Sequence, residues 1–469
     1  MPLPLPSQDL AEYMPAPSAM PGLRYEVGRT LVLAAPLVIG QLTNFGMNFV
    51  DTVMAGRLGK VDLGAIAVGS SIWAAGFLFT LGVLLAVSAT VSQLDGAGRP
   101  RKAGEFTRQA LWLALALAAG LIGLVVSAGW VMEALEVEET VAELAMGYLH
   151  AIAWGAPALV LMLTLRFFSE GAGYTRPTMY VGLLGIACNI PLNWLLMFGN
   201  LGFPRLGAVG AGWATAIVLW LQLLLMVAWI ARRPQYRVFG VFDRYSGPNL
   251  REIAALLKVG LPIGFMVLME GGMFAASALL VGILGALPVA AHQVAMNYTG
   301  LVFMVPLGLS GAITVRVGNA IGRGDPEGAR RAGLVGIGIA MVFAIASAGV
   351  ILLFPEAIVR LYTTDAEVIA LAASLLLFAA IFQLSDGLQV AAAGALRGMK
   401  DTRIPMLYSV VAYWMIGMSV GWWLTFRADW GPAGMWIGIL SGLSVAAVLL
   451  SARYWRLSRR LIRVPGNAA

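Results

Sequence analysis

Charged side chains are scarce in this chain of 469 residues, in which Asp, Glu, Lys and Arg together make up 12%. Soluble domains carry about 25% charged residues, so about half of the usual solvating surface is absent. Hydrophobic residues make up 59%, and the mean hydropathy is +0.83. The apolar residues come in runs of about 20 or more, as a membrane-spanning helix requires. The composition therefore predicts an all-α polytopic membrane protein.

Cysteine and histidine are almost missing as well. The single cysteine, Cys188, excludes a secreted scaffold held by disulfides. His150 and His292 are far apart and lack metal-ligand spacing, so we expect neither a metal centre nor a cofactor. The net charge of +7 does not indicate nucleic-acid binding, because the bases lie in short loops between apolar runs. The proline-rich residues 1–22 have no signal-peptide core, which predicts a flexible tail.

Apolar runs separated by polar, glycine-marked or proline-marked loops fill the rest of the chain. Twelve such runs can be counted, each long enough to cross a bilayer as a helix. The longest loop, 232–252, divides the chain near its middle. The expected spans are 29–54, 64–91, 109–132, 142–165, 178–199, 207–231, 253–282, 288–315, 332–354, 368–394, 404–426 and 431–452.

Lysine and arginine are distributed unevenly between alternate loops. If the N-terminus lies inside, the inner segments hold 26 of the 31 bases. Because basic loops stay in the cytoplasm, we expect both termini and the loop 232–252 there, and the acidic loop 133–143 outside. The five bases of the outer loops are Arg57, Lys60, Arg205, Arg360 and Arg427.

The second half of the sequence repeats the first. After a shift of 226 residues, "PLVIGQLTNFGMNFVDTVMAGRLG" (36–59) aligns with "PIGFMVLMEGGMFAASALLVGILG" (262–285), and "GAGRP" (96–100) with "GRGDP" (322–326). Unrelated apolar helices would share Leu and Val, but not this loop punctuation. The expected organisation is a cytoplasmic tail (1–28), an N-lobe of six spans (29–231), a cytoplasmic loop (232–252), a C-lobe of six spans (253–452) and a basic cytoplasmic tail (453–469).

Each repeat holds six spans, an even number, so both halves enter the membrane in the same direction. They are then related by a pseudo-two-fold axis along the membrane normal. Two such bundles facing each other would leave a central cleft able to open to either side, which is typical of an alternating-access transporter. A duplicated channel or a membrane enzyme with the same plan stays open at this point.

Three carboxylates lie inside the expected spans: Asp51 in the first, Glu270 in the seventh and Asp386 in the tenth. An acid at the centre of a spanning helix costs roughly 2.5 kcal/mol or more, and no Lys or Arg is expected at the same depth. Each acid should therefore be protonated or hold a cation, and either behaviour can couple an ion to a conformational change. Two simpler alternatives are an interfacial Asp51 and a permanently protonated, hydrogen-bonded pair of Glu270 and Asp386.

Amide and hydroxyl side chains accompany these acids. The repeat aligns Asn44 with Glu270 and Ser277 with Asp51. Residues seven apart share one helix face, so the first helix of each half should present a polar stripe that includes its acid.

The fifth span carries a second polar stripe. In "CNIPLNW", Asn189 and Asn193 are four residues apart and share a face, with Pro191 freeing backbone carbonyls between them. Asparagine in hydrocarbon needs hydrogen-bond partners. In the same half, we expect Asp51 and Thr215 to supply them.

Several stretches together resemble a known transporter family. They are "NFVDTVMAGRLG" (48–59), "VSQLDGAG" (91–98), "NIPLNW" (189–194), "AAHQVAMN" (290–297) and "FQLSDGLQVAAAGALRG" (382–398). With the duplicated six-span plan, they resemble the multidrug and toxic compound extrusion (MATE) transporters, especially the bacterial NorM type, over nearly the whole chain after residue 25. The resemblance implies export of cationic, amphiphilic drugs and dyes in exchange for Na⁺ or H⁺, in the bacterial inner membrane. We expect a monomer.

The resemblance also implies two ion sites. In the C-lobe, Glu270 and Asp386 match the acids of a cation site that could hold Na⁺. Where the NorM-like motif often has Tyr, this chain has Phe382, which removes a hydroxyl oxygen and favours proton coupling over Na⁺ coupling. The matching N-lobe cluster is Asp51, Asn189, Asn193 and Thr215. The residues expected to line the substrate cleft are Gln41, Asn44, Ser277 and Gln293.

Two other functions share this architecture. A flippase for lipid-linked precursors would need a strongly basic cleft to hold a pyrophosphate, whereas this chain has acids in its spans and nearly all of its bases in loops. A polytopic membrane enzyme would need reactive groups, yet the sequence has no His cluster, buried Ser/His pair or phosphate loop. The sequence therefore favours a cation-coupled antiporter that is not an enzyme.

The predicted topology can be tested by cysteine labelling from outside the cell. In a Cys188→Ala background, cysteines placed in 133–143 should react with an impermeant thiol reagent, because that acidic loop is outside. Cysteines placed in 232–252 should not react. The reverse pattern would contradict the orientation inferred from the bases.

Overall fold

The computed structural model describes residues 22–463, and every regular element in that range is helical. Residues 1–21 and 464–469, parts of the two expected tails, lie outside the described residues. The first half contains α1 (Leu23–Gly56), α2 (Lys60–Gly96), α3 (Pro100–Ala134), α4 (Glu139–Ala153), α5 (Ala156–Gly171), α6 (Arg176–Phe198) and α7 (Gly207–Arg232). The second half contains α8 (Leu250–Gly282), α9 (Ala286–Gly322), α10 (Pro326–Leu353), α11 (Pro355–Arg360), α12 (Ala366–Gly398), α13 (Arg403–Val410), the π-helix η4 (Val411–Met418), α14 (Ser419–Phe426) and α15 (Pro432–Arg463).

Within the described residues, eleven helical stretches are long and apolar enough to cross a membrane. The bent pair α4 and α5 forms a twelfth span, with an angle of 48° at the break. Pro157, at the start of α5, explains this break, because proline has no N–H to continue the helical ladder and its ring clashes with the preceding turn. The chain is therefore a multi-pass membrane protein with the expected all-α plan of twelve spans.

The helices are longer than the apolar runs that reveal them. The second span is expected to end at residue 91, but α2 continues to Gly96. The last is expected to end at 452, but α15 continues to Arg463. Hydropathy marks only the part of a helix that lies in hydrocarbon, so polar extensions beyond the bilayer escape the prediction.

The repeated glycine and proline punctuation ends one helix and begins the next in both halves. Gly98 and Gly324 have φ angles of +67° and +71°, the left-handed conformation that glycine adopts without strain. In both loops the residue after the glycine donates its N–H to the carbonyl five residues back, at 2.9 and 3.0 Å. Pro100 and Pro326 then begin α3 and α10, where a missing N–H leaves no hydrogen bond unmade.

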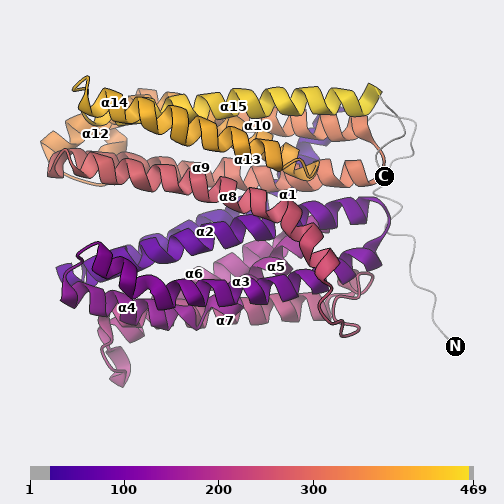
Figure 1. Cartoon of the computed structure of the whole chain (residues 1–469), viewed down its shortest axis with the longest axis horizontal. Coiled ribbons are helices and arrows are strands. Elements are labelled where there is room, and N and C mark those ends of the chain that lie inside the picture. The colour runs from indigo at the N-terminus through magenta and orange to yellow at the C-terminus, as the bar shows by residue number, and fades with distance from the viewer. Residues whose placement is uncertain (1–21, 464–469) are drawn as a thin grey trace.

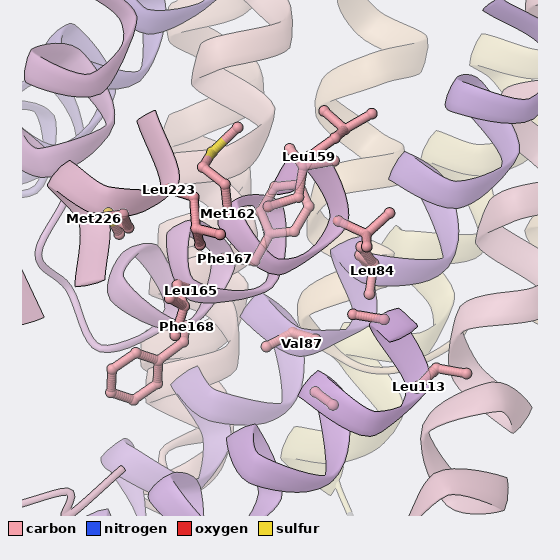
Figure 2. Close-up of a cluster of buried hydrophobic side chains, with 14 of the residues drawn as sticks. Leu84, Val87, Leu113, Leu159, Met162, Leu165, Phe167, Phe168, Leu223 and Met226 are labelled. Atoms are coloured by element: carbon pink, nitrogen blue, oxygen red, sulfur yellow. The ribbon is translucent and has the colours of Figure 1, made fainter. Parts of the chain in front are cut away.

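The two halves form two helical bundles, the N-terminal bundle (α1–α7) and the C-terminal bundle (α8–α15). Figure 1 shows the first in indigo and magenta and the second mostly in orange and yellow. Each bundle has an apolar core of its own. Figure 2 shows part of the first core, where Leu84 of α2, Phe168 of α5 and Met226 of α7 belong to one buried cluster.

The bundles meet where α1 and α2 pack against α8 and α9. Small residues permit close backbone approach: a Cβ on Gly82 of α2 would lie 2.6 Å from the Cα of Gly264 on α8. At the end where α1 begins, Glu26 forms a buried ion pair with Arg316 of α9. Contacts of this kind hold the two bundles together at that end of the molecule.

The connection between the bundles is folded against the first bundle rather than free. Trp112 Nε1 of α3 donates to the carbonyl of Ser246 at 2.9 Å. The hydroxyls of Tyr236 and Ser169 are 2.6 Å apart, and both side chains are buried. The segment expected as a loop therefore fixes the position from which α8 starts.

One buried ion pair lies where the sequence predicts a loop. Arg166 is expected to follow the fourth span, but it lies within α5, with its Nε 2.7 Å from Glu170 Oε1. The two residues are 6% and 4% exposed, and Thr178 Oγ1 also donates to Glu170, at 2.8 Å. The pair is tolerated because each charge has a direct partner.

Replacing Glu170 with Gln should destabilise the protein strongly, because it leaves the charge of Arg166 buried and unpaired. The expected loss is about 3–5 kcal/mol, measured by reversible unfolding of the purified protein in detergent. The matched control is Glu356→Gln, which removes another ion pair of the same spacing, Arg360–Glu356, whose side chains are 66% and 64% exposed. This control should cost less than about 1 kcal/mol. Equal losses in the two variants would contradict this interpretation.

Candidate functional site

Three polar side chains meet between α1 and α6 in the N-terminal bundle. Asn189 Nδ2 and Asn193 Nδ2 donate to Asp51 Oδ1 at 3.0 and 2.5 Å. Asn193 also donates to Asn189 Oδ1, at 3.1 Å. The two asparagines are completely buried, while Asp51 is half-buried. The predicted contact between Asp51 and the asparagine pair is present.

Thr215 of α7 makes no hydrogen bond with this cluster, so the predicted pairing of Thr215 with the asparagines is wrong. Its Oγ1 is buried, and neither that atom nor Asn193 Oδ1 has a hydrogen-bond partner among the described residues. Buried oxygens of this kind can still accept a hydrogen bond or bind a hard cation.

Glu270 of α8 and Asp386 of α12 occupy the interior of the C-terminal bundle. Asp386 is 2% exposed, and Glu270 is half-buried with its Oε1 out of contact with solvent. Within residues 22–463, neither Glu270 Oε1 nor Asp386 Oδ1 has a hydrogen-bond partner. The alternative of a permanently protonated, hydrogen-bonded pair of Glu270 and Asp386 stays open, because these atoms are only one oxygen of each carboxylate. Free carboxylate oxygens in such a place require a proton or a cation.

Phe382, one turn before Asp386, belongs to an aromatic cluster that joins three helices. Its ring centroid is 6.1 Å from that of Phe274 on α8 and 6.0 Å from that of Trp436 on α15, both edge-on. His292 of α9 packs edge-on against Trp436 at 5.8 Å. Phe382 therefore acts in packing and offers no oxygen to the acids.

A buried arginine corrects the expectation that no base lies near these acids. Arg397 is expected in a loop, but it lies in the last turn of α12 and is 6% exposed. It lines a small cavity with Ile263 and Met266 of α8, the helix that carries Glu270. The sequence analysis missed this base because α12 extends past its expected end at residue 394. Residues 22–463 contain no direct Arg397–Glu270 ion pair within 4.0 Å, so Arg397 compensates the acid only from a distance.

Two further polar residues, both missed by the sequence analysis, are buried beside Asp386. Gln389 lies three residues after Asp386, on the same face of α12, and is 1% exposed. Its Nε2 donates to the hydroxyl of Tyr413 at 2.6 Å, and Tyr413 is completely buried. The motif "SDGLQ" (385–389) carried a signal for Gln389. Tyr413 follows Ser409 by four residues, so the two share a helix face, and this spacing was the available signal for Tyr413.

Only three of the four residues expected to line the cleft remain accessible. Gln41 and Asn44 on α1 are half-buried, and Gln293 on α9 is exposed. Because α1 packs against α9, these three lie on helices of the interface between the bundles. Ser277 is completely buried, and its Oγ donates to the carbonyl of Met273 at 2.8 Å. The expectation that Ser277 lines an open cleft is therefore wrong.

Comparison with known proteins identifies the family. The MatE family model matches residues 36–195 and 262–423, one match in each half of the chain. The two matches begin 226 residues apart, which is the offset of the internal repeat.

Curated relatives align along nearly their whole length. A probable multidrug resistance protein NorM from Xanthomonas campestris is 45% identical over 95% of this chain and 97% of its own. The multidrug resistance protein PmpM from Pseudomonas aeruginosa is 45% identical over 94% of each chain. The multidrug resistance protein NorM from Vibrio cholerae is 40% identical over 92% and 95%.

Solved structures share the fold at lower sequence identity. A eukaryotic MATE transporter superposes with a TM-score of 0.86 at 21% identity, covering 94% of this chain and 99% of that one. An outward-facing multidrug resistance transporter of the MATE family superposes with a TM-score of 0.85 at 22% identity, covering 95% and 98%. Two family matches, full-length relatives and a shared twelve-span fold lead to one conclusion: this chain belongs to the MATE (MatE) family of membrane transporters.

Proposed function

We propose that this protein exports cationic, amphiphilic drugs and dyes across the bacterial inner membrane in exchange for H⁺ or Na⁺. One observation carries the proposal: each bundle buries carboxylate or amide oxygens that lack the partners they need. In the C-terminal bundle these are the free oxygens of Glu270 and Asp386, and in the N-terminal bundle that of Asn193 beside Asp51. Such a group is unstable when empty and stable when it holds an ion. The free energy of each conformation therefore depends on whether the ion is bound.

The proposed mechanism requires no contact between drug and ion. An ion that binds the acids better in one orientation of the bundles shifts the protein towards that orientation. A drug that prefers the opposite orientation is then released when the ion binds, because coupling between two ligands is reciprocal. Entry of the ion from outside and departure of the drug to the outside become two parts of one cycle.

The oxygens around the acids support H⁺ as the driving ion. Protons need only the carboxylates themselves, whereas Na⁺ would want a further oxygen that Phe382 does not provide. The second ion-responsive group is Asp51 with Asn189 and Asn193, to which Thr215 could add its free hydroxyl if α7 moved slightly. We therefore propose H⁺ as the driving ion and Na⁺ as the alternative.

The substrate class and setting are proposed on separate grounds. The names of the bacterial relatives refer to multidrug resistance, which supports small-molecule drugs as substrates. Methionine and aromatic side chains, of which the chain has 22 Met and 14 Trp, suit flat apolar cations. The excess of bases in alternate loops supports cytoplasmic termini, and we propose that the monomer is the working unit.

Neutralising the acids should abolish coupled export while leaving the fold intact. We expect Asp51→Asn, Glu270→Gln and Asp386→Asn each to lose drug resistance in cells, with expression near that of the wild type. Each change removes a buried charge without adding volume, so it relieves a desolvation cost. The exposed Glu356→Gln is the control and should export normally. Wild-type resistance in all three acid variants would overturn the proposed mechanism.

The driving ion can be tested by ethidium export from proteoliposomes under a pH gradient alone and under a Na⁺ gradient alone. The wild type should respond to the pH gradient without Na⁺. Strict Na⁺ dependence would overturn the proton assignment. In Phe382→Tyr, we expect Na⁺ stimulation to appear, because the new hydroxyl adds a hard ligand near Asp386.

A further inference from the structure

A buried hydroxyl lies beside the face of α12 that carries Asp386. Phe382 cannot supply one, since its ring packs between Phe274 and Trp436. The hydroxyl of Tyr413 instead lies 2.6 Å from Nε2 of Gln389, one helical turn from Asp386. Both Tyr413 and Gln389 are buried, at 0% and 1% exposure.

We propose that Tyr413 and Gln389 are positioning residues of the C-terminal ion site, in which the Tyr413 hydroxyl holds the Gln389 side chain beside Asp386. The inference rests on the proposed ion coupling at Glu270 and Asp386, and it names two further members of that site. It assigns the pair a role in how tightly the driving cation binds.

The pair of Tyr413 and Gln389 has unused hydrogen-bonding capacity. A phenol has one O–H donor and two lone pairs. The Tyr413 oxygen accepts from Gln389 Nε2, which leaves its O–H available for a carboxylate or a second lone pair for a cation. Gln389 Oε1 has no hydrogen-bond partner among the described residues. The pair therefore brings a free hydroxyl and a free amide oxygen into a site that has few hydrogen-bond partners for its acids.

The backbone that presents Tyr413 has an unusual conformation. Residues Val411–Met418 form a π-helix, a rare conformation that appears mostly as single turns, frequently at functional sites. This π-helix is tied to α8 on both sides of Glu270. Trp414 Nε1 donates to the carbonyl of Met269 at 3.1 Å, and Ser277 Oγ lies 3.7 Å from Met418 Sδ.

Both acids lie on helices that pack beside Tyr413. Glu270 is on α8, which contacts the π-helix, and Asp386 is on α12, one turn before Gln389. Arg397, further along α12, lines a small cavity with residues of α8. On α9, the buried His292 contacts Trp436, which belongs to the same apolar cluster as Tyr413. Because Tyr413 is neutral, its hydrogen bond with Gln389 can persist whichever ionic state the acids adopt.

The test is ethidium export from proteoliposomes at increasing concentrations of the driving cation. In Tyr413→Phe, the half-saturating cation concentration should rise about tenfold, as expected when a charged group loses one hydrogen bond. The maximal rate and ethidium binding in detergent should stay near wild type, because the ring and its packing remain. Gln389→Met should shift the half-saturating concentration in the same direction.

The matched control is Tyr454→Phe. Tyr454 is also a buried tyrosine of the C-terminal bundle, and it lies on α15 far from Trp436. Its hydroxyl donates to the carbonyl of Ala329 at 3.0 Å. This change should leave the cation dependence unaltered. The inference would be overturned if Tyr413→Phe and Gln389→Met had the same half-saturating cation concentration as Tyr454→Phe. Failure of the proposed function is separate, since it would appear as normal ion-driven export by Glu270→Gln.

Discussion

A bilayer cannot solvate an isolated carboxylate, and this constraint governs the arrangement of the C-terminal bundle. Glu270 and Asp386 are placed among apolar and aromatic side chains, with free oxygens and one arginine nearby that makes no ion pair with them. Such groups cost several kcal/mol as bare anions. This cost disappears when an ion binds, so the free energy of the bundle depends on ion occupancy. The helices that hold the acids, α8 and α12, are then the elements that respond to ion binding.

The same constraint explains why the two halves differ although they descend from one repeat. In the N-terminal bundle, Asp51 accepts two hydrogen bonds from neighbouring asparagines and is half-buried. In the C-terminal bundle, one oxygen of each acid has no hydrogen-bond partner among residues 22–463, and the polar residues beside Asp386 are Gln389 and Tyr413. Backbone contacts at glycines such as Gly82 let the bundles approach closely, so a change of packing within one bundle can be transmitted across the interface.

The sequence predicted the features that follow from the solvent, because apolar runs, basic loops and isolated acids each have a direct physical cost in a bilayer. It therefore found the twelve spans, the three acids and the contact of Asp51 with Asn189 and Asn193. It could not find features that depend on how helices turn relative to one another. Tyr413 lies in a mainly apolar run, and its hydrogen bond with Gln389 depends on how its π-helical segment packs beside α12. Arg397, Ser277 and Thr215 were misplaced for the same reason, since helix ends and side-chain directions depend on packing partners far away in the chain.

The central claim is that the drug and the coupling ion compete through the buried acids. The most direct measurement adds ethidium to purified protein in weakly buffered detergent and follows released H⁺ with a pH indicator and released Na⁺ with a radioactive tracer. The account predicts that ethidium binding releases one of these ions from the wild type and neither ion from the Glu270→Gln, Asp386→Asn double variant. Ethidium binding to the wild type without release of either ion would contradict it.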